Sequence, residues 1–306
     1  MLEGEEAAQA VAEASRKTTS RRDLQQNPNF ESVSPEVGVL DEDAFDQLLD
    51  LEPDAALSLL AELTGATDER LRSLAQRLAA QVLIRFAQRG AAPRRGISRL
   101  KVQRGSQFGD LDLDRSLDAL LAARTQPLNP DDLWSSGWVR DSTSVCLLID
   151  RSGSMLGDRL TTAAVAAAAV LLGTQASTSV VAFSDTGVVL HPQGPSTEPE
   201  GVVTQLLRLR GHGTTDLSNA LRVAQEQLLR APAGHHLTLL LSDCRVTSGG
   251  SAATAAASLK HLMILPPAED SADAEEFARQ VGAPCVPVAS PSDVPRAITQ
   301  ALDMFR

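Results

Sequence analysis

The spacing of apolar residues in the N-terminal part of the chain is helical. Apolar side chains recur every three or four positions over residues 40–63, and again over residues 71–86, where Asp68 stands in the position of an N-cap. A third, shorter amphipathic stretch covers residues 116–124. The pattern predicts a mostly helical region over residues 37–125.

A different pattern follows, in which short and nearly continuous apolar runs alternate with helical stretches. Buried parallel strands joined by crossover helices have this pattern. The expected strands cover residues 144–149, 179–183, 188–191, 237–241, 261–265 and 285–288, and the expected helices cover residues 160–172, 201–209, 217–229, 252–259, 272–281 and 294–304. Only four residues, 184–187, separate the second and third strands, which indicates a hairpin and one antiparallel edge strand. We therefore expect a doubly wound, Rossmann-like α/β domain over residues 141–306.

Two segments lack a clear periodicity. Residues 1–36 mix charges of both signs with Ser, Thr, Asn and Pro, which predicts a flexible arm, and residues 126–140 are interpreted as a linker. Residues 85–104 carry seven basic and no acidic side chains. This basic stretch is either a solvated segment neutralised by the acidic N-terminal residues or a docking patch for an acidic partner.

Composition narrows the class of protein. The 306 residues are 43% hydrophobic, enough for a sizeable core, but only 3% are aromatic and the net charge is −11. These values argue against a nucleic-acid partner. The acidic N-terminus does not resemble a signal peptide, no apolar run is long enough to span a bilayer, and three separated cysteines suit a reducing compartment. We expect a cytoplasmic protein.

Oxygen-bearing side chains gather where the strands of the α/β domain end. The first strand ends at Asp150, and Ser152 and Ser154 follow it; the segment 211–216 supplies hydroxyl groups, and Asp243 follows a later strand. In an open α/β sheet, ligands bind beyond the carboxyl ends of the strands. Two carboxylates with several hydroxyls are typical ligands of Mg²⁺, and Mn²⁺ fits the same set.

The order of these motifs resembles the von Willebrand factor A (VWA) domain with its metal-ion-dependent adhesion site (MIDAS). The matching elements are a DxSxS motif, a GTTD loop and an aspartate after a later strand. The resemblance implies direct coordination by Ser152, Ser154 and a loop threonine, with Asp150 and Asp243 often acting through water. A partner's Asp or Glu then completes the shell of the ion.

Two details of the motif leave choices open. Within the GTTD loop the family pattern selects Thr215 as the ligand over Thr214. The family usually has glycine after the last aspartate, where this chain has Cys244, so the turn there is in question. Without a metal, Asp150 and the two serines would serve only to cap the following helix.

The arrangement of the whole chain is similar to that of bacterial CoxE-like proteins, which work with MoxR-type AAA+ ATPases. The similarity rests on a helical segment, the basic stretch 94–105, the acidic segment 110–121 and a C-terminal VWA domain. It implies a non-enzymatic adaptor or co-chaperone in protein maturation or metal insertion. The alternative is a magnesium-chelatase-D-like subunit. No GxxxxGK[ST] motif occurs, so any ATP must be hydrolysed by a partner.

Two enzyme interpretations fit less well. A Mg²⁺-dependent phosphatase of the haloacid dehalogenase type needs a second carboxylate where Ser152 stands, and a lysine between the threonine loop and Asp243, but no lysine occurs from residue 102 to residue 259. A serine hydrolase with Ser152 or Ser154 as nucleophile lacks the GxSxG elbow.

Overall fold

The computed structural model forms two compact units, residues 1–92 together with 143–306, and residues 93–142. It describes the chain except for residues 16–17, 91–97, 106–108, 124–126, 141–142, 152–157, 174–176, 196–198, 210–213, 233 and 306. The larger unit is thus built from two stretches of sequence that the smaller unit separates.

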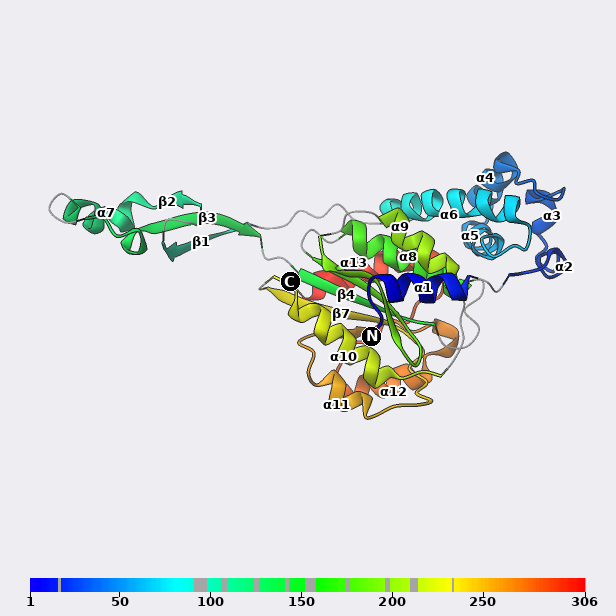
Figure 1. The fold of residues 1–306 in the computed structure, drawn as a ribbon. Helices are drawn as coiled ribbons and strands as arrows, with labels where there is room; N and C mark the ends of the chain where they lie inside the picture. The colour runs from blue at the N-terminus through cyan, green and yellow to red at the C-terminus, as the bar shows by residue number, and fades with distance from the viewer. Residues whose placement is uncertain are drawn as a thin grey trace. The chain divides into compact units, whose positions relative to one another are not determined.

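A five-stranded sheet of order β6-β5-β4-β7-β8 forms the centre of the larger unit (Figure 1). Its strands are β4 (Thr143–Asp150), β5 (Thr178–Phe183), β6 (Gly187–Gly194), β7 (His235–Leu241) and β8 (Leu262–Ile264). All neighbours pair in parallel except β5 and β6, which are antiparallel. The doubly wound α/β fold with one antiparallel edge strand is confirmed.

Helices cover both faces of this sheet because β4 is apolar on both sides. Val145, Leu147 and Ile149 belong to one buried cluster, and Cys146 and Leu148 to another. The first cluster includes α8 (Asp158–Gly173), α9 (Pro199–Arg208) and α13 (Val294–Met304), and the second includes α10 (Leu217–Leu229), α11 (Ala252–Ala256) and α12 (Ala272–Val281). Three helices have the bounds that the sequence predicts, namely α10, α12 and α13.

The N-terminal helices share the first of these clusters. They are α1 (Glu5–Ala14), α2 (Arg21–Leu24), α3 (Phe30–Val33), α4 (Glu42–Leu51), α5 (Pro53–Leu63) and α6 (Glu69–Gly90). The helical spacing of residues 40–86 and the Asp68 N-cap appear as expected, with Asp68 accepting the N–H of Leu71 at 3.0 Å. The Thr161 hydroxyl donates to the Leu57 carbonyl at 3.3 Å, so α5 and α8 pack closely.

Residues 1–36 differ from the flexible arm that the sequence suggested. They contain α1–α3, and Phe30 and Val33 are fully buried. The Leu2 N–H donates to the Gly187 carbonyl at 2.8 Å, and the Leu2 carbonyl accepts the Val189 N–H at 2.9 Å, so Leu2 pairs with the edge strand β6. These contacts are tertiary, and a search for local periodicity does not detect them.

The smaller unit contains a three-stranded antiparallel sheet of order β1-β3-β2. Its elements are β1 (Ser98–Arg104), β2 (Asp110–Leu111), α7 (Leu113–Ala122), a 3₁₀ turn (Pro130–Asp132) and β3 (Trp134–Arg140). We expected a mostly helical region over residues 37–125 and a linker over 126–140. The first region is mostly helical but also contains β1 and β2, and β3 lies in the second. Their side chains are mostly polar, which hides the strand pattern.

The last strand expected from the sequence does not form a full strand in the structure. The strand expected over residues 285–288 is reduced to two isolated parallel bridges, Ile264 with Cys285 and Pro267 with Val288.

Among the described residues, no helix has both the length and the apolar character needed to cross a membrane.

Candidate functional site

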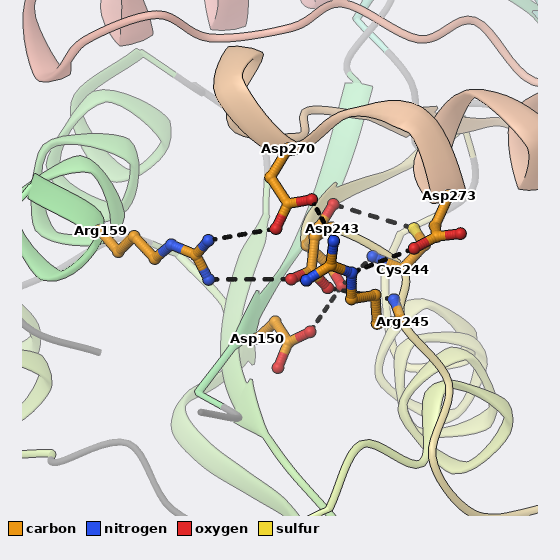
Figure 2. Close-up of polar contacts among 8 residues, drawn as sticks. Asp150, Arg159, Asp243, Cys244, Arg245, Asp270 and Asp273 are labelled. Atoms are coloured by element: carbon orange, nitrogen blue, oxygen red, sulfur yellow. Dashed lines mark hydrogen bonds and ion pairs between the residues drawn. The ribbon is translucent and has the colours of Figure 1, made fainter. Parts of the chain in front are cut away.

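Asp150 and Asp243 lie at the carboxyl ends of the two adjacent central strands. Ile149 of β4 pairs with Leu241 of β7, and Asp150 and Ser242 each follow directly. The Ser242 hydroxyl donates a hydrogen bond of 2.6 Å to Asp150 Oδ2 (Figure 2). The connections on the two sides of β4 run over opposite faces of the sheet. This edge is therefore the topological switch point, where α/β folds bind ligands.

The turn after Asp243 is tight and contains Cys244 in a conformation that favours glycine. Cys244 has a φ of 60° and is the only non-glycine residue with positive φ in the described part of the chain. Its N–H donates to the Ser242 hydroxyl at 2.9 Å, and the Arg245 N–H donates to Asp243 Oδ1 at 3.0 Å. Cys244 replaces the glycine that is usual in the family, but the turn keeps its glycine-like conformation. This conformation strains the backbone at Cys244.

Thr215 is buried and is held against the segment that follows Asp243. It is 2% exposed, whereas its neighbour Thr214 is exposed. The Thr215 N–H donates to the Thr247 hydroxyl at 2.7 Å, and its carbonyl accepts the Thr247 N–H at 3.2 Å. Gly249, with a φ of 96°, allows the same segment to approach the Asp216 carboxylate, which a Cβ at this position would overlap. The loop before α10 and the loop after β7 are thus in direct contact.

The loop after β5 also contacts these segments. The Arg151 N–H donates to the Phe183 carbonyl at 2.8 Å, and the Asp216 N–H donates to the Ser184 carbonyl at 2.8 Å. The Arg151 side chain is 6% exposed; burial lowers the pKa of its guanidinium, and the nearby Asp185 opposes this shift. Sequence reasoning did not single out Arg151, although an arginine inside the DxSxS motif was a visible signal.

Two arginines that sequence reasoning missed link the acidic residues of this edge (Figure 2). The Arg159 guanidinium lies 3.7 Å from Asp243 Oδ2 and 3.4 Å from Asp270 Oδ2. The Arg245 guanidinium contacts Asp270 at 2.6 Å and Asp273 at 3.1 Å. Positive and negative side chains therefore alternate along this edge, from Arg159 on α8, through the loop after β7, to Asp273 on α12. No local sequence motif indicates this network, because its members lie up to 114 positions apart in sequence, from Arg159 to Asp273.

The predicted metal ligands fall into two groups. Asp150, Thr215 and Asp243 are described and lie on the loops just outlined, whereas Ser152 and Ser154 lie outside the described residues. The described donors are all carboxylate or hydroxyl oxygens, the ligand type that Mg²⁺ and Mn²⁺ prefer. No group of three His, Cys, Asp or Glu suited to a metal occurs in the described ranges.

The three cysteines lack the features of catalytic nucleophiles. Burial raises the pKa of the Cys146 thiol to about 12 and also raises the pKa values of Cys244 and Cys285, so each is a weak nucleophile. Of the histidines, His235 begins β7 and so lies at the opposite end of this strand from Asp243, and His261 packs on the Phe305 ring at 4.9 Å. His212 lies outside the described residues.

Several solved structures are similar to this chain at low identity. A von Willebrand factor type A protein from Catenulispora acidiphila is 15% identical, with a TM-score of 0.44, and the match covers 67% of this chain and 49% of that one. The manganese-loaded TRAP protein of Plasmodium vivax is 15% identical, with a TM-score of 0.43 over 54% of this chain and 73% of the other. Proximal thread matrix protein 1 of the mussel byssus, with a zinc-occupied MIDAS motif, is 13% identical, with a TM-score of 0.44 over 53% and 48%.

Family membership rests on the sequence. A search of the curated proteins finds no match. The family model for VWA-domain-containing CoxE-like proteins matches residues 74–282, more than half of the chain. The match includes Asp150, Thr215 and Asp243 together with the whole of the smaller unit. The chain therefore belongs to the family of VWA-domain-containing CoxE-like proteins.

Proposed function

We propose that this protein is a non-enzymatic adaptor that binds a protein partner through a divalent cation, with Mg²⁺ as the resident ion and Mn²⁺ as a substitute. The observation that carries the proposal is the junction of Asp150 with the Ser242–Asp243 turn at the carboxyl ends of β4 and β7. This junction holds two carboxylates at the edge of the sheet where α/β domains bind ligands.

Each proposed ligand has a distinct part in the site. Ser152, Ser154 and Thr215 would offer neutral hydroxyl oxygens, and Asp150 and Asp243 would offer charge, directly or through water. The Ser242 hydroxyl orients the Asp150 carboxylate, and the Arg245 N–H orients that of Asp243. When bound, the cation supplies a charge that attracts a carboxylate from another protein. The Thr215 hydroxyl is the better candidate than that of Thr214, because its backbone is fixed on both sides by Thr247.

The proposed partner is a MoxR-type AAA+ ATPase or its client, which presents an Asp or Glu to the ion. Support comes from the CoxE-like family match and from the absence of a phosphate-binding GxxxxGK[ST] motif in the sequence. We further propose that the pair acts in the cytoplasm, in protein maturation or metal insertion. A chelatase-type subunit that presents a metal as substrate is the second candidate, and it differs in using the cation catalytically.

A capture experiment tests the adaptor proposal. The tagged full chain is incubated with lysate of its own host in Mg²⁺ or in EDTA, and bound proteins are identified by mass spectrometry. An AAA+ ATPase is expected among the proteins bound in Mg²⁺ alone. Asp150→Ala should lose this partner and still unfold cooperatively, at a lower melting temperature because the Ser242 hydroxyl loses its acceptor. The control Asp273→Asn, at an exposed acid of the same edge, should retain the partner. Equal capture with and without EDTA would reject the proposal.

A further inference from the structure

A cavity of about 120 Å³ opens at the carboxyl edge of the sheet, directly beside the candidate metal site. Asp150, Ser242 and Asp243 form part of its lining. For comparison, apolar cavities of about 150 Å³ bind benzene. The cavity is therefore large enough for one aliphatic side chain.

The deep wall of this cavity is apolar and belongs to the core. Ile149, Ala163, Leu241, Leu265 and Val288 line it, and we refer to these five residues as the apolar pocket. They come from the ends of β4 and β7, from α8, and from the segments after β8 and before α13. None is more than 8% exposed. Because close-packed core side chains hold their positions, the apolar pocket is shaped before any ligand arrives.

The rim of the cavity is polar and carries a cation. Arg159 reaches from α8 towards Asp243 and Asp270 (Figure 2). It also lines the cavity. The carboxylates of Asp150, Asp243 and Glu269 line the cavity as well, so the rim carries charges of both signs and the guanidinium offsets part of the negative charge. The carboxylates of the candidate metal site therefore lie on one side of an opening whose interior has the properties of a hydrophobic specificity pocket.

We propose that the apolar pocket receives the aliphatic side chain adjacent to the partner's metal-bound Asp or Glu, so that the recognised motif is an acid next to Leu, Ile or Val. This inference rests on the proposed function and adds specificity to it. Since Asp150 and Asp243 line the cavity themselves, the metal site and the apolar pocket share one opening, and two neighbouring side chains of a bent segment can reach both. An aromatic ring is less suitable, because the cavity is smaller than those that bind benzene.

Blocked tetrapeptides test the proposal with the full chain in Mg²⁺. The probes are Gly-Glu-Leu-Gly and Gly-Leu-Glu-Gly, compared with Gly-Glu-Gly-Gly and Gly-Glu-Lys-Gly. Binding is followed by methyl NMR, with the methyl groups of Ile149, Leu265 and Val288 as local reporters. At least one leucine peptide should bind roughly tenfold more tightly than the glycine peptide and shift these methyl signals. The lysine peptide should bind no better than the glycine peptide.

Variants that fill the cavity identify the binding position. Thr162→Phe and Ala289→Trp add bulk at its partly exposed and exposed lining positions and do not alter any proposed metal ligand. Both should remove the advantage of the leucine peptide and leave the binding of the glycine peptide unchanged. The control Ala257→Trp, at an exposed position after α11, should have no effect. Melting curves show that each variant folds.

The outcomes separate the two proposals. Metal-dependent binding of all peptides with equal affinity would overturn the apolar pocket and leave the adaptor proposal standing. Leucine-peptide binding that persists in EDTA and disappears in Thr162→Phe would support the pocket and contradict metal-mediated recognition. Peptide binding that neither EDTA nor the filling variants change would reject both.

Discussion

The Ser242 hydroxyl donates a hydrogen bond of 2.6 Å to Asp150 Oδ2 and joins the ends of two strands that are 92 positions apart in sequence. The same hydroxyl oxygen accepts the Cys244 N–H at 2.9 Å. Ser242 is 4% exposed, so water cannot readily replace either bond. One buried hydroxyl therefore fixes both a candidate metal ligand and the turn that carries the other.

Removal of this hydroxyl should reduce stability. In Ser242→Ala the Asp150 carboxylate loses a donor and the Cys244 N–H loses its acceptor. Hydrogen bonds to charged groups contribute about 1.5–3 kcal/mol, and we expect the free energy of unfolding to fall by about 2 kcal/mol in urea titrations. The exposed Ser32→Ala is the control and should change it by less than about 0.5 kcal/mol. Equal stability of Ser242→Ala and the wild type would show that the bond is not formed in solution.

The positive φ of Cys244 predicts an unusual order of stability among its variants. Cys244→Ala keeps the strained backbone, whereas Cys244→Gly removes the Cβ responsible for the strain. The left-handed conformation costs a non-glycine residue roughly 1–2 kcal/mol, so the glycine variant should be about 1 kcal/mol more stable than the alanine variant. Ala257→Gly, at an αR position with a φ of −61°, is the matched control and should be destabilising. An alanine variant as stable as the glycine variant would contradict the turn geometry.

The buried thiol of Cys146 should make stability fall at alkaline pH. Its pKa rises from 9.0 in the unfolded chain to about 12 in the fold, because burial disfavours the thiolate. A group whose pKa is raised by folding stays protonated in the native state, so unfolding releases its proton and becomes easier above pH 9.0. Between about pH 8 and about pH 10, urea titrations should show a loss of about 1 kcal/mol that Cys146→Ala lacks. Parallel pH profiles for the two proteins would refute this.

The ion pair between Arg159 and Asp243 predicts an effect on metal affinity. The guanidinium lies 3.7 Å from Asp243 Oδ2 and competes electrostatically with a cation at this carboxylate. Arg159 is partly exposed, so the effect is modest, on the order of 1 kcal/mol or a fewfold change in Kd. In Mn²⁺ titrations followed by electron paramagnetic resonance, Arg159→Gln should bind more tightly than the wild type. Arg279→Gln, on the exposed side of α12, should bind equally, and weaker binding by Arg159→Gln would contradict the competition.

Much of the α/β domain could be predicted from sequence because its elements are fully buried or strongly amphipathic. β4 and β7 are apolar runs, and α10 and α12 carry clear helical stripes, so local pattern and tertiary environment agree. The smaller unit was missed for the opposite reason. In β1 and β3 charged and hydroxyl side chains interrupt the alternation, and pairing between distant strands, not burial, defines them.

The same distinction applies to the candidate site. The sequence singles out Asp150, Thr215 and Asp243 as candidates because each lies at a strand end or before a helix, positions that a sequence reveals. Arg159 and Asp270 were not found, since their relevance depends on where α8 and the segment after β8 lie in space. The apolar pocket could not be predicted from the sequence either. Its walls are ordinary core residues, and the space between them depends on how these residues are arranged in the fold.

The division of the larger unit into residues 1–92 and 143–306 has a consequence for biosynthesis. At about 5–20 residues per second, a ribosome needs several seconds to translate the interval between these stretches. Until α8 emerges, the apolar side of α5, including Leu57 and Leu60, lacks the surface against which it packs in the finished molecule. The nascent N-terminal helices must wait for their counterpart, and a holdase chaperone that shields them would raise the yield of correctly assembled chains.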